Sequence, residues 1–183
     1  MRRYFGFIVI IALVLVTFLG KNNSDAQDTE GVKINIFNVS KGEFEKVSKI
    51  SSNKDELRKT LTEEQFHITQ EQGTEPAHTG KWLKNKKTGV YQCVVCKTDL
   101  FASDAKYDSG TGWPSFWKPV ADENVGTKED RSLFMRRVEV HCPVCGSHLG
   151  HIFDDGPAPT GKRFCINSAA LTFEAMEEND ENQ

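Results

Sequence analysis

The sequence has no excess of positive charge: its 183 residues include 23 Lys and Arg against 26 Asp and Glu, a formal net charge of −3. Proteins that hold nucleic acid through its phosphates need clustered basic side chains, so a nucleic-acid partner is excluded from the expected functions. Internal repeats are also missing, apart from one short cysteine motif that occurs twice. The length allows one domain with appendages, which we expect to act as a monomer.

Only the N-terminus contains a long apolar run. Arg2 and Arg3 precede the run of residues 5–19, and polar residues follow it. This order is typical of an export signal and predicts a signal peptide over residues 1–26. The alternative is an uncleaved membrane anchor through residues 5–20, because the run is only slightly shorter than the roughly 17–25 residues that span a bilayer. No cysteine follows the run, which argues against a lipoprotein. We expect an exported protein, in the bacterial periplasm.

The rest of the chain divides into a polar linker over residues 27–52, a domain over 53–175 and an acidic tail over 176–183. Within the linker, the patch from Val32 to Ile36 alternates between apolar and polar residues. An edge strand and a mostly flexible linker are equally good interpretations of this patch.

Two short helices are predicted at the start of the domain. Asn53 stands three residues before Glu56, and Thr62 three before Gln65, which is the spacing of a capping box. From residue 89 onward the composition predicts short strands joined by turns, hence a mainly β domain. The predicted strands are Val90–Val95, Leu133–Val140, His151–Phe153, Phe164–Ile166 and Leu171–Phe173, with turns at 108–112, 126–128, 154–157 and 160–162.

Four of the five cysteines form two C-x2-C pairs, Cys93 with Cys96 and Cys142 with Cys145, separated by 45 residues. This spacing lets both sulfurs of a tight turn face one ion, and four thiolates suit zinc, or iron in a rubredoxin-like site. In an exported protein the alternative is two disulfides, but a disulfide within one C-x2-C is a poor structural crosslink. The pattern therefore predicts a structural zinc ion, because sulfur fills all four positions.

The fifth cysteine, Cys165, is then the candidate for chemistry. Arg163 and Asn167 lie two residues to either side and share its face of a predicted strand, so Arg163 should lower the pKa of the thiol. His148 and His151 add groups that exchange protons near neutral pH. The alternative is a buried, inert thiol, which is common for free cysteine.

A Gly-rich loop presents three aromatic residues, Trp113, Phe116 and Trp117. They could form a wall that holds an apolar or thioether group. An aromatic cluster that merely covers the sheet explains the pattern equally well.

Read in order, these segments resemble B-type methionine sulfoxide reductases (SelR-like domains), which act on the R epimer of methionine sulfoxide. The resemblance covers residues 53–173, nearly the whole domain. Its motifs are Gly73-Thr74-Glu75-Pro76, Gly89-Val90-Tyr91-x-Cys93-x-x-Cys96, Tyr107-Asp108-Ser109-Gly110-x-Gly112-Trp113-Pro114-Ser115-Phe116, Cys142-x-x-Cys145-x-x-His148-Leu149-Gly150-His151-x-Phe153-x-Asp155-Gly156-Pro157 and Gly161-x-Arg163-Phe164-Cys165-Ile166-Asn167-Ser168-Ala169.

The resemblance implies two antiparallel sheets in a tent-like arrangement, short N-terminal helices and a structural four-cysteine zinc site. It implies that Cys165 attacks the sulfoxide sulfur of oxidised proteins or peptides and becomes a sulfenic acid. Trp113 would pack on the substrate methyl group, with Phe153 as a second wall. The remaining roles concern protons: His148, His151 and Asn167 would orient and protonate the sulfoxide oxygen, and Arg163 would favour the thiolate.

One position departs from the pattern of many relatives. Where they have a second, resolving cysteine, this chain has Thr111. A single-cysteine cycle is therefore predicted, in which an external dithiol such as thioredoxin reduces the sulfenic acid.

Two other functions compete. In a zinc-ribbon-like binding module Cys165 would be dispensable. A thiol–disulfide oxidoreductase would use a C-x-x-C pair, but such pairs usually precede a helix in an α/β pattern, and here both lie in β-rich sequence.

Overall fold

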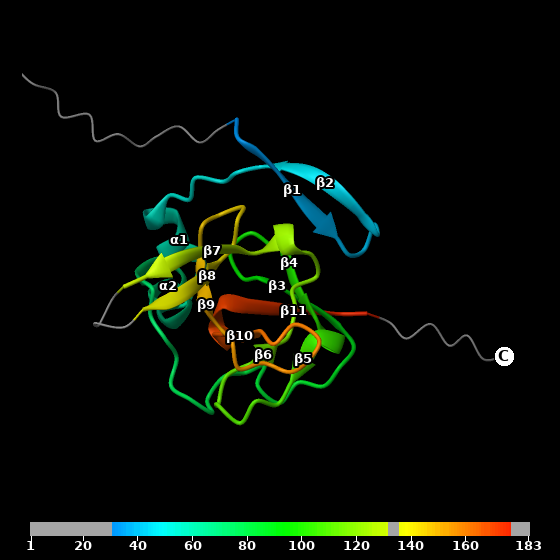
Figure 1. Ribbon diagram of the computed structural model, residues 1–183. Helices are drawn as coiled ribbons and strands as arrows, with labels where there is room; N and C mark the ends of the chain where they lie inside the picture. The colour runs from blue at the N-terminus through cyan, green and yellow to red at the C-terminus, as the bar shows by residue number, and fades with distance from the viewer. Residues whose placement is uncertain (1–30, 132–135, 177–183) are drawn as a thin grey trace, which may run out of the picture.

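The structure is a computed structural model that describes residues 31–131 and 136–176. The expected signal peptide or anchor and nearly all of the acidic tail lie outside these residues. The elements, labelled in Figure 1, are β1 (Lys33–Asn38), β2 (Glu43–Ser48), α1 (Lys54–Thr60), α2 (Glu63–Glu71), β3 (Gly89–Cys93), β4 (Asp99–Ala102), η1 (Ser103–Ala105), β5 (Lys106–Tyr107), β6 (Ser115–Phe116), η2 (Asp122–Asn124), β7 (Gly126–Asp130), β8 (Arg137–His141), β9 (His148–Phe153), β10 (Arg163–Ile166), η4 (Ser168–Ala170) and β11 (Leu171–Ala175).

The fold is mainly β, as predicted, and its described strands pair antiparallel in three sheets. A six-stranded sheet has the order β5-β6-β10-β9-β8-β7, and a three-stranded sheet has the order β11-β3-β4. These two correspond to the sheets that the resemblance implied. The third, β1 with β2, is an N-terminal hairpin.

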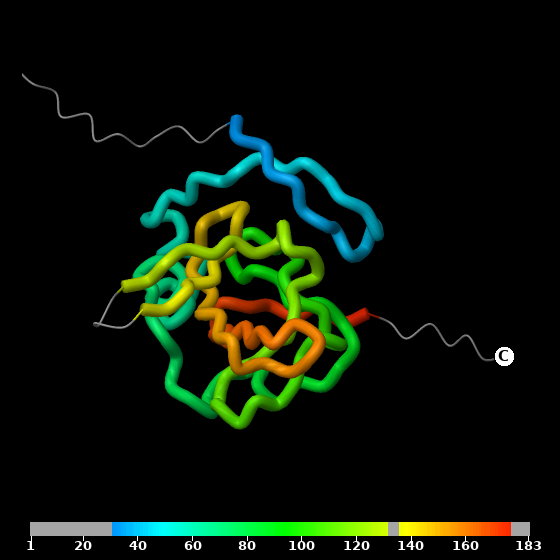
Figure 2. The backbone as a smooth tube through the Cα atoms, in the orientation of Figure 1, coloured from blue at the N-terminus to red at the C-terminus, as the bar shows by residue number. Residues whose placement is uncertain are grey.

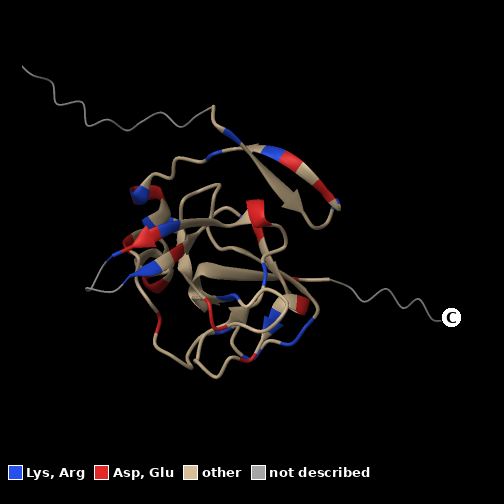
Figure 3. Cartoon of the chain, viewed as in Figure 1, with Lys and Arg blue, Asp and Glu red and all other residues tan. Residues whose placement is uncertain are grey.

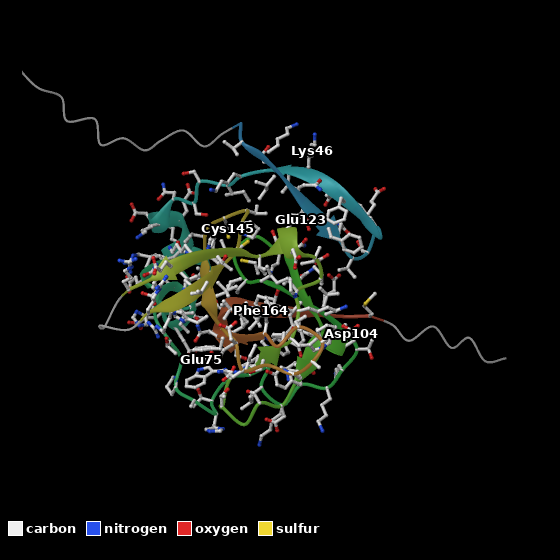
Figure 4. The ribbon with its side chains drawn as sticks, viewed as in Figure 1. Lys46, Glu75, Asp104, Glu123, Cys145 and Phe164 are labelled. Carbon is white, nitrogen blue, oxygen red and sulfur yellow. The ribbon has the colours of Figure 1, made fainter. Side chains whose placement is uncertain are left out.

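The core lies between the two larger sheets, and aromatic rings join them. Phe101 of β4 stacks on Phe116 of β6 with ring centroids 4.4 Å apart, and it also meets Phe164 of β10 at 5.6 Å. Tyr91 of β3 meets Phe116 edge-on at 5.1 Å. Figure 4 labels Phe164 in the interior of the domain. Because Phe164 faces the core, its neighbour Cys165 faces the opposite side of the strand.

The two predicted helices are present: α2 packs against β9 and η4, and α1 packs against α2 (Figure 1). The capping box of Thr62 and Gln65 is complete, with both reciprocal bonds formed. Asn53 caps α1 differently from the prediction, since its side chain accepts from the N–H of Asp55. No helix within residues 31–131 and 136–176 is long and apolar enough to cross a membrane.

Residues 33–48 of the expected linker form the β1–β2 hairpin, so the strand interpretation is correct there and the flexible-linker interpretation is wrong. The hairpin lies along one side of the domain (Figure 2) and is held by the fully buried Asn124. The Asn124 amide accepts from the N–H of Phe37 at 2.8 Å and donates to its carbonyl at 2.8 Å. Asp99 adds a bond to the N–H of Val39 at 2.9 Å. Polar composition alone did not show that these backbone groups had partners.

The predicted turn at 126–128 is wrong, because these residues begin strand β7. Gly126 is opposite His141 in the pairing of β7 with β8. A Cβ at Gly126 would lie 2.3 Å from His141 Nε2, so this glycine serves a close approach and not a turn. In the predicted strand 133–140, residues 133–135 lie outside the described part of the chain, and β8 covers 137–141.

Charges of both signs meet on β7 and β8, as the blue and red segments of Figure 3 show. Asp130 of β7 binds Arg137 of β8 at 2.8 Å, and Lys128 of β7 lies 3.1 Å from Glu139 of β8. Glu139 is paired in turn with His151 of β9, so these charged residues border the face of the sheet that carries His151.

Candidate active site and metal centre

The four paired cysteines come together, as predicted. Their sulfur atoms all lie within 4.8 Å of one another, with Cys93 Sγ 3.6 Å from Cys145 Sγ and Cys96 Sγ 3.4 Å from Cys142 Sγ. Zinc–sulfur bonds of about 2.3 Å place tetrahedral sulfurs about 3.8 Å apart, so the cluster fits one ion. All five cysteines are free thiols, and the disulfide alternative is wrong. Figure 4 labels Cys145 at this end of the domain.

Both cysteine pairs are built on the same turn. In each turn the N–H of the first cysteine donates to the carbonyl five residues later, at 2.9 Å, and the residue after the second cysteine donates back to the first cysteine's carbonyl. That residue has a left-handed backbone in both turns: Lys97 with φ 62° and Gly146 with φ 73°. The turn ends β3 at Cys93, two residues earlier than predicted. The same turn at two places presents two pairs of sulfurs to one point.

The six-stranded sheet places a row of reactive side chains on one face. Tyr107 is paired with Ser115, Ser115 with Cys165, Cys165 with His151, and His151 with Glu139. Directly paired residues of antiparallel strands share a face, with Cβ atoms about 4.5–5.5 Å apart. Strand pairing therefore fixes the position of Cys165 next to both a hydroxyl group and an imidazole.

A cavity of about 140 Å³ opens over this row. It contains five of the seven residues predicted for catalysis and substrate binding, and His148 and Arg163 are not among its lining residues. The lining residues are Thr74, Trp113, Arg137, Gly150, His151, Phe153, Cys165 and Asn167. An aromatic wall, a thiol, an imidazole and an amide thus meet at one small opening.

The pKa of the Cys165 thiol differs from the sequence-based expectation. Burial raises it, and the positive charge of Arg163 and a hydrogen bond with Thr111 only partly offset that effect. Arg163 also has other partners: its guanidinium binds Asp155 through two bonds of 2.8 and 2.9 Å and packs on the ring of Phe153 at 4.4 Å. The predicted direction of the arginine effect is correct. The pKa of Cys165 is nevertheless raised overall, because desolvation, which was not predicted, outweighs the arginine effect.

His151 is held by a carboxylate that sequence reasoning missed. Its Nε2 lies 2.8 Å from Asp130 Oδ2, and the same oxygen binds Arg137 at 2.8 Å. Arg137 also lines the cavity. The alternation of charged and apolar residues in β8 is the only sequence signal that would have placed Arg137 on this face.

His148 lies buried behind the cavity, with 3% of its side chain exposed. Its Nδ1 is 3.0 Å from Glu139 Oε1, close enough for an ion pair but without the alignment of a hydrogen bond. Burial lowers the pKa of His148, and Glu139 partly offsets this. The imidazole is therefore neutral near pH 7, and its ring contacts that of His151 with centroids 5.4 Å apart.

Glu75 joins the two sides of the cavity, although the sequence analysis gave this residue of the Gly73–Pro76 motif no role. Its N–H donates to Asn167 Oδ1 at 3.1 Å, and its carbonyl accepts from Trp113 Nε1 at 3.0 Å. Its carboxylate accepts from the N–H groups of Ser168 and Ala169 at 2.7 and 2.8 Å. One buried residue therefore positions both the aromatic wall and the amide. Figure 4 labels it.

Comparison with known proteins agrees with this geometry. The model of the SelR domain matches residues 61–175. A protein named peptide methionine sulfoxide reductase MsrB, from Methanosarcina barkeri, is 50% identical over 134 residues, which cover 73% of this chain and 94% of that protein. The whole β1–β2 hairpin and the expected linker of residues 27–52 precede the SelR match. The chain belongs to the SelR domain family, the B-type methionine sulfoxide reductases.

Proposed function

We propose that this protein reduces the R epimer of methionine sulfoxide in oxidised proteins or peptides, with Cys165 as the nucleophile. The observation that carries the proposal is the small cavity in which Cys165 faces Trp113 and Phe153. An aromatic surface favours the methyl and thioether part of the side chain. His151 and Asn167, which line the same cavity, favour its polar oxygen.

In the proposed first step the Cys165 thiolate attacks the sulfoxide sulfur and forms a transient S–S bond. The oxygen then moves to the cysteine sulfur, and the S–S bond and the bond between oxygen and the substrate sulfur both break. The substrate sulfur gains two electrons and leaves as a thioether. Cys165 loses two electrons and, with the oxygen and a proton, becomes a sulfenic acid. The sum is thiol plus sulfoxide giving sulfenic acid plus thioether, so no other reactant is needed.

The proton reaches the oxygen through groups that the cavity holds. Because Asp130 engages Nε2 of His151, Nδ1 is the nitrogen that can exchange a proton with the substrate. The amide of Asn167, fixed by Glu75, orients the oxygen. His148 supports the ring of His151 from behind and keeps it in place. Arg163 favours the thiolate by its charge.

The second step needs an external thiol, because Thr111 occupies the position of the resolving cysteine. One thiol of a dithiol reductant, such as thioredoxin, forms a mixed disulfide with Cys165 and releases water. Its second thiol then restores Cys165 and leaves as a disulfide. Mass spectrometry after one turnover without reductant should find a sulfenic acid at Cys165. An intramolecular disulfide would instead identify one of the four clustered cysteines as the resolving residue.

Zinc is proposed as the ion of the four-cysteine cluster, one per chain. When bound it supplies a structural crosslink between the end of β3 and the β8–β9 turn, and it leaves no open position for substrate. Elemental analysis should find one zinc per chain in the wild type and in Cys165→Ser. If neither protein contains a metal, the cluster is not a metal site. If both contain iron, the ion of the cluster is iron and not zinc.

The decisive experiment supplies the two separated sulfoxide epimers to the purified protein with dithiothreitol. The R epimer should be reduced and the S epimer left unchanged. Cys165→Ser should abolish turnover while retaining its zinc, which separates the reacting thiol from the structural ones. Turnover of the S epimer in place of the R epimer would contradict the proposed substrate.

The cellular role follows from the N-terminal segment. We propose export to the bacterial periplasm, cleavage after residue 26 and repair of oxidised surface methionines by a monomer, with an uncleaved anchor as the alternative. The mass of the protein recovered from cells tests this: the intact chain is 20.6 kDa, and a cleaved chain begins at Gln27. Recovery of the intact chain in the membrane fraction would establish the anchor.

A further inference from the structure

Three hydroxyl groups form a hydrogen-bonded line beside the strand that carries the active-site sulfur. Ser115, fully buried, lies beside Cys165 in the sheet, and its Oγ is 3.2 Å from the carbonyl of Trp113. Ser115 Oγ is 2.7 Å from Ser109 Oγ, which is 2.9 Å from Thr111 Oγ1. The Thr111 hydroxyl, like Arg163, lowers the pKa of Cys165 through its side chain. The line therefore begins at a carbonyl acceptor and leads to a hydroxyl that acts on the sulfur.

The three hydroxyls can form hydrogen bonds along this line whether the Cys165 sulfur is a thiol or a thiolate. With a thiol, the S–H donates to Thr111, Thr111 to Ser109, Ser109 to Ser115, and Ser115 to the Trp113 carbonyl, so four donors satisfy four contacts. With a thiolate, the three hydroxyls rotate: Ser115 donates to Ser109, Ser109 to Thr111, and Thr111 to the sulfur. Hydrogen bonds that all point along a chain strengthen one another.

We propose that Ser115, Ser109 and Thr111 act as a reversible hydroxyl chain that donates to the Cys165 sulfur and stabilises its ionised forms, the thiolate and the sulfenate. Thr111 is then a catalytic residue that contacts the reacting atom, and Ser109 and Ser115 are positioning residues. The inference deepens the proposed function, because it gives a task to the residue that stands where many relatives have a resolving cysteine.

The hydroxyl chain supplies hydrogen-bond donors to a buried sulfur whose ionised form is disfavoured. Burial disfavours the Cys165 thiolate, and Arg163, whose side chain favours it, also binds Asp155 through two hydrogen bonds. A hydroxyl donor adds stabilisation without adding charge to the cavity. The charged and titratable groups near the sulfur are Arg163 of β10, Asp155 of the β9–β10 connection, Tyr107 of β5, His151 of β9 and Arg137 of β8. Variants of the hydroxyl chain leave all five residues unchanged.

The test measures alkylation of Cys165 by iodoacetamide against pH, with the modified peptide quantified by mass spectrometry. Thr111→Val removes the hydroxyl but keeps the shape, and Thr111→Ser keeps the hydroxyl. We expect Thr111→Val to raise the midpoint by about one pH unit and to slow alkylation at pH 7 about tenfold, the effect of losing one hydrogen bond to a charged group. Thr111→Ser should titrate like the wild type. Far-UV circular dichroism confirms the fold of each variant.

Two further variants test whether the three hydroxyls act together or whether the Thr111 hydroxyl acts alone. Ser109→Ala should raise the midpoint by a smaller amount, because Thr111 loses its own donor. Thr172→Val, which removes a strand hydroxyl far from the chain in the sheet of β11, is the matched control and should change nothing. If the alkylation midpoint of Thr111→Val equals that of the wild type, the proposal is wrong. If the midpoint of Ser109→Ala is unchanged, the three hydroxyls do not act together.

This measurement uses no methionine sulfoxide. A shifted midpoint without reduction of the R epimer would retain the hydroxyl chain and reject the proposed substrate. Reduction of the R epimer with unchanged alkylation midpoints would support the proposed substrate and reject the hydroxyl chain.

Discussion

Replacing Glu75 by glutamine tests whether one buried carboxylate holds the cavity together. Glu75 is 3% exposed, and its two oxygens accept from the N–H groups of Ser168 and Ala169 at 2.7 and 2.8 Å. Glutamine keeps one acceptor and turns a donor toward the other N–H. Leaving a buried N–H unsatisfied costs about 1–3 kcal/mol, and the remaining bond weakens by about 1 kcal/mol when the charge is lost.

One effect acts in the opposite direction. Burial raises the pKa of the Glu75 carboxyl despite the two N–H donors, so removing the charge also removes a desolvation cost. We therefore expect a net loss of about 2 kcal/mol in the free energy of unfolding. With an m value of about 1–3 kcal/mol per M in urea, the midpoint should fall by about 1 M. Zinc concentration is held constant, because a bound metal shifts apparent stability.

The matched control is Glu64→Gln, an exposed residue of the preceding helix, which should change stability by less than about 0.5 kcal/mol. The active-site arm measures KM for the R sulfoxide, which should rise in Glu75→Gln because Trp113 and Asn167 both bind the Glu75 backbone. A Glu75→Gln protein that unfolds at the wild-type urea concentration would refute the capping role of the carboxylate.

Three other variants test separate parts of the structure. Asn124→Ala removes the bonds that hold the N-terminal hairpin, so limited proteolysis should cleave near residues 39–42 faster than in the wild type; equal protection would show that the hairpin is held by other contacts. Trp113→Ala should weaken substrate binding by about 1–3 kcal/mol and raise KM roughly 5- to 150-fold, whereas Trp117→Ala, outside the cavity lining, should leave KM near the wild-type value; an unchanged KM in Trp113→Ala would reject the aromatic wall. Arg163→Gln removes a charge that lowers the pKa of Cys165, so the rise of kcat/KM should shift to higher pH, and a shift to lower pH would contradict the sign of the arginine effect.

Local patterns in the sequence predicted what local structure decides. The C-x2-C spacing located the four-cysteine cluster, because each pair of sulfurs is presented by one turn. The Thr62–Gln65 pair located a helix start for the same reason, since its two bonds span three residues. The position of Cys165 on a strand face followed from the period of two.

Contacts between distant segments were not predictable in this way. Glu75 meets Asn167 across 92 residues of sequence, and Asp130 meets His151 across 21. The net pKa of Cys165 also depended on such contacts. The nearby Arg163 was visible in the sequence, but burial by distant segments was not, and burial is the larger effect.

The two histidines show why even a correctly recognised motif did not determine geometry. His148 and His151 are three residues apart, so a regular strand would place them on opposite faces. In the structure Val140 is paired with Gly150 but His141 with His148, so Leu149 is an extra residue in β9. Because of this bulge both histidines lie on the same face of the sheet, and their ring centroids are 5.4 Å apart. The proximity of the histidines therefore depends on a single inserted residue, without which His148 would lie on the opposite face of the sheet from His151.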